Sequence, residues 1–441
     1  MNKIKKQLYL TAKAFYYLLP KAIRNQYSDS VPFYKKLIKD LIQRSVGDKL
    51  FYYIITDNIA KLTNNFKILS ELKDRTSTIK GSAIYPHNEK MFTLPSITEN
   101  VLDVKIVIFD NVSVIGSTDA LVVGDYIFHQ ELLMMKKHHD LKRFDIFVNF
   151  NVEQKQFVAV NIKNVNIYNE KDTIYISLLK EHSINYYHWI TENIPRLVLI
   201  LKELSKIERK EIIKNKKVIF LIDEGMPKQC IEIINLIVPF EFLIREVKKG
   251  EMCQCSNLIY CSPFWQSLDN TKGDLDSKEF FVDRYAIELV DKAIKDNVKL
   301  STKPADRKIY LRRKPSQARS ILNNEQVEAY MKSNDFEIIE TDKMSFVEQV
   351  KLFHEAKLVV GASGATFTNI LFMQPSTKAI IFYPSHPSVN HGIFQPLADV
   401  SEINLIHYKT IAQDMESIHS NFFIDLHKLD KLLNNGEFDA L

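Results

Sequence analysis

Hydrophobic and polar positions follow two different patterns along this chain, and the change comes near residue 155. Before it, residues 50–130 carry short β-type runs separated by turn residues, which predicts a meandering sheet. After it, buried-strand patterns alternate with helical ones, as is typical of βαβ units. The runs of the first part are 105–109, 113–115, 121–123 and 126–129, and the second part predicts strands at 173–178 and 217–222 and helices at 185–204 and 228–237.

The same alternation continues as far as a strand predicted at 379–383. Ser345-x-x-Glu348, preceded by the apolar Met344, predicts a capping box that starts a helix at 346–356. Alternating elements of this length predict a parallel sheet covered by helices on both faces. The remaining predicted elements are strands at 308–312, 336–340, 358–360 and 379–383, a helix at 324–333, and a helix that begins after the turn at 361–366.

The chain is longer than the size at which a single hydrophobic core usually stops growing. At 441 residues, two α/β lobes with additional elements are expected. The stretch 262–305 is polar around one helical pattern at 279–298, and it is interpreted as the connection between the lobes. The predicted organisation is a helical N-terminal segment at 1–50, an N-terminal lobe at 51–265, the connection at 266–305 and a C-terminal lobe at 306–441.

Composition narrows the class of protein. Hydrophobic residues make up 46% and charged residues 26%, which argues against disorder and against a collagen-like or disulfide scaffold. A net charge of +5 gives little support to nucleic-acid binding but leaves anionic ligands open. The four cysteines lack a second ligand cluster, so structural thiols in a reducing cytoplasm are expected; they are Cys230, Cys253, Cys255 and Cys261.

The N-terminus predicts a basic amphipathic helix over residues 1–26. Apolar residues such as Ile4, Leu8 and Phe15 share one face, and lysines surround it. The helix could lie on an anionic membrane surface or pack on its own protein, and the sequence leaves both alternatives open. No apolar run reaches the roughly 20 residues that a membrane-spanning helix needs, and no cleavable signal is evident.

A turn of small residues after the strand at 358–360 is the strongest candidate site. Small residues let the backbone approach a ligand, and the N–H groups at the start of the next helix would face an anion. The turn lacks a P-loop lysine and the G-x-G-x-x-G spacing, and it departs from G-x-S-x-G at Ala365. A tight turn for packing is the alternative. The segment is Gly361-Ala362-Ser363-Gly364-Ala365-Thr366-Phe367-Thr368-Asn369, of which Ser363, Gly364, Ala365, Thr366 and Asn369 are the predicted anion-binding residues.

Arginines follow the first strand of the same lobe. Arg312 and Arg313 stand at the carboxyl end of that strand, and Arg319 follows in the loop. Ligands of parallel sheets bind at such ends, and guanidinium groups match phosphate oxygens. Together with the turn of small residues, these arginines predict a diphosphate site. A solvated basic loop is the alternative, and Lys314 is assigned to it.

In the first lobe, His188 and Glu192 lie one helical turn apart on the same face. A carboxylate beside an imidazole raises its basicity and fixes its orientation, which suits a general base acting on a hydroxyl. A hydrogen-bonded structural histidine is the alternative.

Two motifs have residue types or a spacing that could indicate a metal site. Asp274-Leu275-Asp276 has the D-x-D spacing of metal-dependent sugar transferases, and His138-His139-Asp140 clusters possible ligands. Both lie in polar stretches without a strand end nearby, so the sequence predicts solvated loops and no metal site.

In these residues the chain resembles glycosyltransferase family 61, including members from bacterial capsule and surface-polysaccharide clusters. The resemblance implies a GT-B architecture with two Rossmann-like lobes facing a cleft, the nucleotide held by the C-terminal lobe, and inverting, metal-independent transfer. One departure is Ser363, where family members commonly carry histidine; a serine cannot supply a cationic imidazole, so the donor could differ. The matching pieces are Tyr187-His188-Trp189, Pro195-Arg196-Leu197, Arg312 to Arg319, Asn324-Glu325, Phe346-x-Glu348-Gln349, Gly361 to Asn369 and Leu371-Phe372-Met373-x-Pro375.

The expected protein is therefore a glycosyltransferase of capsule or surface-polysaccharide synthesis. Its expected partners are a nucleotide sugar, an oligosaccharide or lipid-linked glycan acceptor and an anionic membrane surface, with no nucleic acid and no cofactor beyond the donor. The expected location is the cytoplasm, at the inner face of the membrane. Two rivals stay open: a non-catalytic nucleotide-sugar sensor or assembly scaffold, suggested by Ser363, and a metal-dependent sugar-phosphate transferase, suggested by Asp274-Leu275-Asp276.

Overall fold

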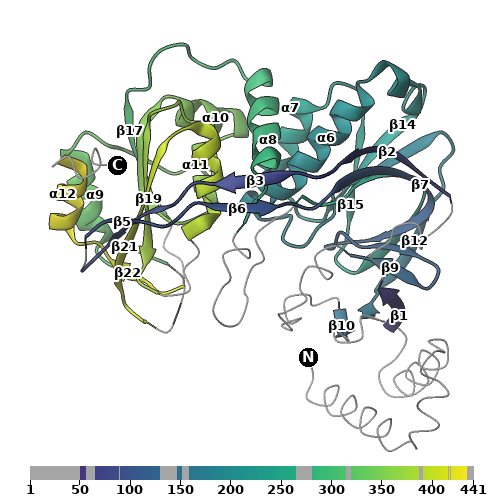
Figure 1. The fold of residues 1–441 in the computed structure, drawn as a ribbon, viewed down its shortest axis with the longest axis horizontal. Coiled ribbons are helices and arrows are strands. Elements are labelled where there is room, and N and C mark those ends of the chain that lie inside the picture. The colour runs from purple at the N-terminus through teal and green to yellow at the C-terminus, as the bar shows by residue number, and fades with distance from the viewer. Residues whose placement is uncertain are drawn as a thin grey trace, which may run out of the picture.

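Two β-sheets stand on either side of a layer of helices (Figure 1). The sheets contain parallel and antiparallel pairs and the helices alternate with strands, which confirms the predicted mixed α/β class. The structure is a computed structural model, and it describes residues 50–55, 65–88, 90–129, 147–150, 158–264, 281–313, 319–386, 391–415, 417 and 419–434. The helix expected over residues 1–26 lies outside these residues.

The larger sheet has twelve strands in the described part of the chain, in the order β10-β11-β1-β9-β8-β7-β16-β13-β14-β15, with β12 beside β16 and β2 beside β7. Its strands pair in parallel from β12 through β16, β13 and β14 to β15, and β1 and β9 also form a parallel pair. The strands are β1 Leu50–Ile55, β2 Phe66–Leu72, β7 Val104–Ile115, β8 Leu121–Val123, β9 Tyr126–Phe128, β10 Phe147–Phe150, β11 Val158–Asn161, β12 Asn164–Tyr168, β13 Thr173–Ser177, β14 Lys217–Asp223, β15 Leu243–Val247 and β16 Glu251–Cys261.

The predicted meander is present in β7, β8 and β9, which pair in antiparallel order. One detail of the prediction was wrong, because the runs at 105–109 and 113–115 belong to a single strand. Asn111 between them adopts a φ of 55°, a left-handed conformation that asparagine tolerates. Strand β16 pairs with residues on both sides of Asn111, so the polar interruption does not end β7.

The helix predicted over 185–204 has three parts: α5 Tyr186–His188, the π-helical turn η3 Trp189–Asn193 and α6 Ile194–Leu204. The N–H of Ile194 donates to the carbonyl of Trp189, five residues back, which defines the π turn. Pro195 in the first turn of α6 has no N–H to donate. Two further helices accompany this sheet, η4 Ile207–Ile212 and α7 Lys228–Ile237, the second as predicted.

The smaller sheet has eight strands in the described residues, in the order β18-β17-β19-β20-β21-β4-β5, with β22 beside β21. The predicted parallel strands are confirmed, and β19 is longer than expected. Its strands are β4 Ala83–Pro86, β5 Phe92–Thr93, β17 Arg307–Leu311, β18 Glu337–Ile339, β19 Ala356–Ala362, β20 Lys378–Pro384, β21 Asn404–Ala412 and β22 Phe422–Phe423. Its helices are α9 Asn324–Ser333, α10 Phe346–His354, η6 Ala365–Phe372, η7 His391–Ile393, α11 Gln395–Ser401 and α12 Leu426–Asn434.

The capping box at the start of α10 is confirmed. The N–H of Glu348 donates to Oγ of Ser345 at 3.3 Å, and the N–H of Ser345 donates to Oε2 of Glu348 at 2.7 Å. Two backbone donors that a helix end would otherwise leave without partners are thereby satisfied.

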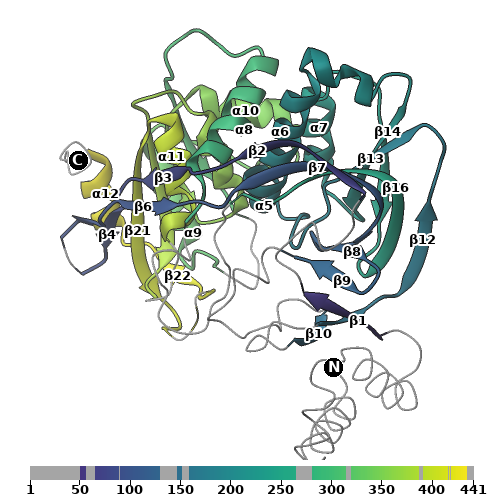
Figure 2. The ribbon, with the colours of Figure 1, turned by 45° about the vertical axis from the view of Figure 1, so that its right-hand side comes forward.

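An early segment of the chain crosses from the larger sheet to the smaller one (Figure 2). Strand β4 pairs with β21 in parallel, and the rings of Tyr85 and Tyr408 lie 5.4 Å apart across this pair. The hairpin strands β3 Thr76–Ile79 and β6 Ile97–Asn100 flank this crossing. Gly81 makes the close approach possible, because a Cβ there would lie 1.7 Å from the carbonyl oxygen of Leu94.

Helix α8 Arg284–Asn297, predicted at 279–298, lies in the middle of the molecule and contacts α6, α7 and α11 (Figure 1). It buries Ala286, Ile287, Val290 and Ile294, and each of the larger side chains contributes about 1.5–3 kcal/mol when fully buried. The core around it is continuous from Ile176 of the larger sheet to Val359 of the smaller one. The division into lobes facing a cleft stays a prediction.

The four cysteines are buried and reduced, which confirms structural thiols. Burial raises the pKa of the Cys230, Cys253 and Cys261 thiols to about 12, so they stay protonated near neutral pH. Within the described residues, no helix combines the length and the apolar character required to cross a membrane.

Candidate active site

Two predicted parts of the site come together at the carboxyl ends of β17 and β19. These strands are parallel neighbours, with Leu311 opposite Gly361, so the residues that follow them meet. Nη1 of Arg313 donates to the carbonyl oxygen of Ser363 at 2.5 Å, and Nη1 of Arg319 donates to Oγ of Ser363 at 3.4 Å. Ser363 therefore orients both guanidinium groups.

Arg313 and Arg319 carry charge that the described residues do not neutralise, because neither forms an ion pair with a carboxylate there. Burial and the neighbouring Arg319 lower the pKa of Arg313, and burial lowers the pKa of Arg319. Nε of Arg319 is buried without a hydrogen-bond partner in the described structure. Two partly buried cations that repel each other are stabilised by an anion placed between them.

Arg312 differs from these two arginines. Its Nε donates to Oε1 of Glu328 at 2.7 Å, its Nη2 contacts the other oxygen of the same carboxylate, and its Nη1 lies 3.3 Å from Oε1 of Glu340. These hydrogen bonds raise the pKa of Arg312. The side chain is thus neutralised by protein carboxylates, and its role toward a diphosphate stays a prediction.

The glycines of the turn allow close packing, Gly361 against β17 and Gly364 against the guanidinium group of Arg313. A Cβ on Gly361 would lie 2.9 Å from the carbonyl oxygen of Leu311, so this glycine lets β17 and β19 approach. A Cβ on Gly364 would lie 3.1 Å from Nη1 of Arg313. Ala365 starts η6, and the hydroxyl of Thr366 lies 3.1 Å from that of Thr341.

Asn369 is fully buried, and protein groups hold both ends of its amide. Oδ1 accepts from the hydroxyl of Tyr186 at 2.6 Å, and Nδ2 donates to Oε1 of Gln349 at 2.8 Å. Asn369 therefore links η6 to α5. The predicted base His188 lies two residues after Tyr186, and Ser363 lies six residues before Asn369, so the two halves of the predicted site stand on contacting elements.

Nδ1 of His188 lies 2.7 Å from Oε1 of Glu192, as their spacing predicted. The other oxygen of Glu192 is 3.6 Å from Nζ of Lys180. The side chains of His188 and Glu192 are 10% and 4% exposed, so this pair is shielded from water. A carboxylate at Nδ1 favours the tautomer with a proton there, which makes Nε2 the basic nitrogen.

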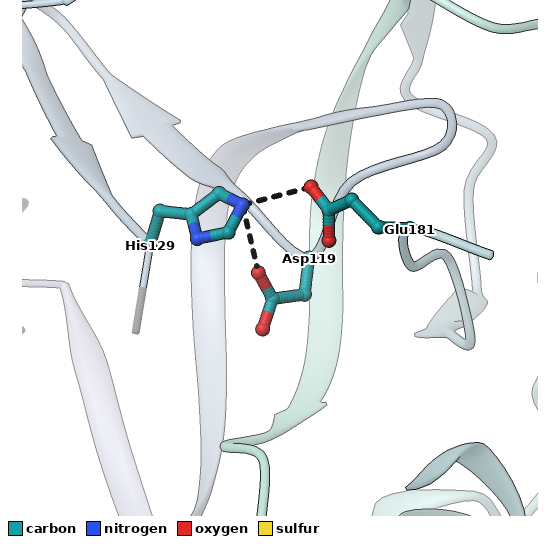
Figure 3. A group of neighbouring side chains, drawn as sticks. All are labelled: Asp119, His129 and Glu181. Carbon is teal, nitrogen blue, oxygen red and sulfur yellow. Dashed lines mark hydrogen bonds and ion pairs between the residues drawn. The ribbon is translucent and has the colours of Figure 1, made fainter. Parts of the chain in front are cut away.

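Asp119, His129 and Glu181 form a second buried polar group (Figure 3). No sequence pattern predicted this group. The polar run 180–182 after a buried strand was a usable signal for Glu181. Asp119 stands in an ordinary turn, and His129 ends the predicted β-type run 126–129, so neither gave such a signal. Glu181 directly follows Lys180, which connects the group to Glu192.

Asp223, at the end of β14, links the segment after β7 to the segment after β13. Its carboxylate accepts hydrogen bonds from the N–H groups of Ser117 at 2.5 Å and Lys180 at 3.2 Å, and from the hydroxyl of Ser183. Burial outweighs these bonds and raises the pKa of Asp223 to about 6.

Some candidates are not part of this arrangement. Asp274-Leu275-Asp276, His138-His139-Asp140 and Lys314 lie outside the described residues. A surface pocket of about 570 Å³ lies between β3 and the start of α8, and its lining includes Arg75, Lys80 and Arg284. None of the predicted site residues lines that pocket.

Residues 186–380 match the family model described as Glycosyltransferase 61. No curated protein matches the chain. The matched segment begins at α5 and ends in β20, so it contains His188, the three arginines and the turn at 361–366, whereas Asp119, His129 and Glu181 precede it. This chain therefore carries a glycosyltransferase family 61 domain, and the protein is a glycosyltransferase.

Proposed function

We propose that this protein is an inverting glycosyltransferase that moves a sugar from a nucleotide-sugar donor to a glycan acceptor without a metal ion at the diphosphate. We place it in capsule or surface-polysaccharide synthesis on the cytoplasmic face of the membrane, with GT-B lobes as the architecture. The observation that carries the proposal is the pair Arg313 and Arg319, uncompensated within the described residues and directed at Ser363. Two guanidinium groups supply the positive charge that a divalent ion supplies in other transferases.

The donor diphosphate binds beside Ser363 in this proposal. Its oxygens accept charge-assisted hydrogen bonds from Arg313 and Arg319, which are shorter and stronger than neutral ones. Because negative charge grows on the diphosphate as the bond to the sugar breaks, these contacts strengthen in the transition state. Ser363 holds the arginines through its hydroxyl and carbonyl oxygens and needs no imidazole for that task.

The acceptor hydroxyl is activated by His188. Nε2 takes the proton as the acceptor oxygen attacks the anomeric carbon, on the face opposite the departing diphosphate. The bond from that carbon to the diphosphate oxygen breaks, and the sugar is inverted. Glu192 stabilises the imidazolium that forms, because its carboxylate lies 2.7 Å from Nδ1.

The proposal is tested by thermal melting with a panel of nucleoside diphosphates and nucleotide sugars, since a ligand that binds only the folded state raises the melting temperature. The stabilising donor is then assayed for sugar transfer to lipid-linked and soluble glycans by dialysed protein, without and with added Mg²⁺ or Mn²⁺. Equal transfer in both conditions is expected. Binding without turnover would support a sensor or scaffold, and transfer that needs added Mg²⁺ or Mn²⁺ would support the metal-dependent enzyme.

A further inference from the structure

We propose that Asp119, His129 and Glu181 bind a divalent transition-metal ion, with Zn²⁺ as the expected occupant. The side chains come from separate segments: Asp119 follows β7, His129 follows β9 and Glu181 follows β13 (Figure 3). Each offers one ligand atom, and these atoms lie within 4.8 Å of one another. This site is additional to the transferase chemistry proposed above.

The distances already approach those of a metal centre. Nε2 of His129 is 2.8 Å from Oε1 of Glu181 and 3.3 Å from Oδ1 of Asp119. Around a tetrahedral zinc ion with bonds of about 2.0–2.2 Å, ligand atoms lie about 3.3–3.6 Å apart. The separation between His129 and Asp119 fits this range, and the separation between His129 and Glu181 is about half an ångström shorter than its lower end.

Burial and missing hydrogen bonds point to a cation. His129, Asp119 and Glu181 are 0%, 2% and 7% exposed. In the described structure neither carboxylate oxygen of Asp119 accepts a hydrogen bond, and neither does Oε2 of Glu181. A buried carboxylate oxygen without a donor is costly, and a bound cation removes that cost.

Two protein cations, Lys180 and Arg196, interact electrostatically with the Asp119 carboxylate, and they affect which ion is selected. Lys180 is directed at Glu192, with Nζ 3.6 Å from Oε2, and Nε of Arg196 donates to the carbonyl of Cys261 at 2.7 Å. Their charge weakens attraction for any dication, which disfavours weakly held ions. An imidazole ligand further favours Zn²⁺ over Mg²⁺ and Ca²⁺, which prefer oxygen-only sites.

A bound ion would join the ends of β7, β9 and β13 at one point. It would also fix Glu181, and with it the adjacent Lys180 that faces Glu192. The ion would therefore keep the side chains of His188 and Glu192 in position. Its role would be structural.

The test uses the full-length protein and does not depend on sugar transfer. Metal content of the purified, dialysed protein is measured by mass spectrometry, and Zn²⁺ is titrated into chelator-stripped protein by calorimetry and thermal melting. About one zinc per chain, micromolar or tighter binding and a higher melting temperature with Zn²⁺ are expected. Wild-type protein without bound zinc, together with binding weaker than millimolar, would overturn the proposal.

Variants locate the ion. Asp119→Asn and Glu181→Gln preserve shape and remove one negative charge each, so both should lose zinc at least tenfold more readily than wild type. Asp110→Asn, on an exposed position of β7, is the matched control and should retain zinc. Equal zinc retention in Asp119→Asn and wild type would identify an adventitious ion and overturn the assignment. Should the variants not fold, the wild-type titration decides.

Discussion

The hydroxyl of Tyr186 on α5 donates a hydrogen bond of 2.6 Å to Oδ1 of Asn369 on η6. Burial raises the pKa of Tyr186 well above its ordinary range, so the hydroxyl keeps the proton that it donates. This bond attaches the helical turn that carries His188 to the helix that follows Ser363. The relative placement of the proposed base and the proposed diphosphate site thus depends on this buried contact.

Tyr186→Phe removes the hydroxyl and leaves Oδ1 of Asn369 buried without its donor. We expect a loss of about 1–3 kcal/mol in the free energy of unfolding. Turnover should fall further than the folded fraction does, because α5 and η6 are no longer held in register. Denaturant melts and initial rates check this. Tyr330→Phe, which removes a 2.8 Å bond to Asp430 on α12, is the control for loss of a hydroxyl away from the site.

Arg319→Ala should weaken nucleotide-sugar binding by about 1.5–3 kcal/mol, roughly 10- to 150-fold, because a charge-assisted contact to the diphosphate is lost. Arg312→Ala is the matched arginine variant, and it should change affinity much less, since Glu328 and Glu340 already hold that side chain. Calorimetric titration of the donor compares the two. Unchanged affinity in folded Arg319→Ala would remove this residue from the site.

His188→Ala should leave nucleotide affinity nearly unchanged and lower turnover by roughly 10²–10⁴-fold, the usual contribution of positioned acid–base catalysis. The measurement pairs thermal melting with initial rates at saturating donor and acceptor across pH. A variant that melts early yet keeps near-normal turnover per folded molecule would show a structural histidine. Glu192→Gln would then be the next variant to test.

Asp223 predicts a pH-dependent stability. Burial raises its pKa from 3.8 to about 6, so between these values the folded protein holds a proton that the unfolded chain releases. The contribution of Asp223 to the free energy of unfolding is therefore fully present below about pH 4, and it is lost as the pH rises through 6. Two pKa units correspond to about 3 kcal/mol. The stability of wild type relative to Asp223→Asn should fall by that order from pH 4 to 7, and Asp110→Asn controls for loss of a carboxyl. A flat difference would contradict the prediction.

Deletion of residues 1–26 should reduce binding to anionic vesicles, if the basic amphipathic pattern lies on a membrane. Co-sedimentation with vesicles that contain phosphatidylserine, compared with neutral vesicles, measures this. Equal sedimentation of the full chain and the truncated chain would assign the segment to packing on the protein.

Local patterns predicted most elements of the structure, because strand and helix periodicity is set by neighbouring residues. The capping box at Ser345 and Glu348 and the i,i+4 pair of His188 and Glu192 were readable for the same reason. Contacts between segments far apart in the sequence could not be predicted from local patterns. The pairing of β4 with β21 and the gathering of Asp119, His129 and Glu181 depend on the tertiary fold.

The arginines show the same limit within one motif. Sequence placed Arg312 and Arg313 together at a strand end, but alternate residues of a strand end point to opposite faces. Arg313 reaches Ser363, whereas Arg312 reaches Glu328 on α9. The side chains that pack around the strand end determine which of the two adjacent arginines faces a ligand. The partner of Arg312 is Glu328, sixteen residues later, so no local pattern indicated this pairing.

The pairing of β4 with β21 also constrains how the protein is made. Residues 83–86 leave the ribosome early, and their partners at 406–409 follow only after about 320 more residues. At synthesis rates of about 5–20 residues per second, β4 waits roughly 15–65 seconds for its neighbour. β4 therefore cannot take its place in the smaller sheet until residues 406–409 have been synthesised, and the edge of β4 that pairs with β21 stays available for wrong pairing until the two segments meet.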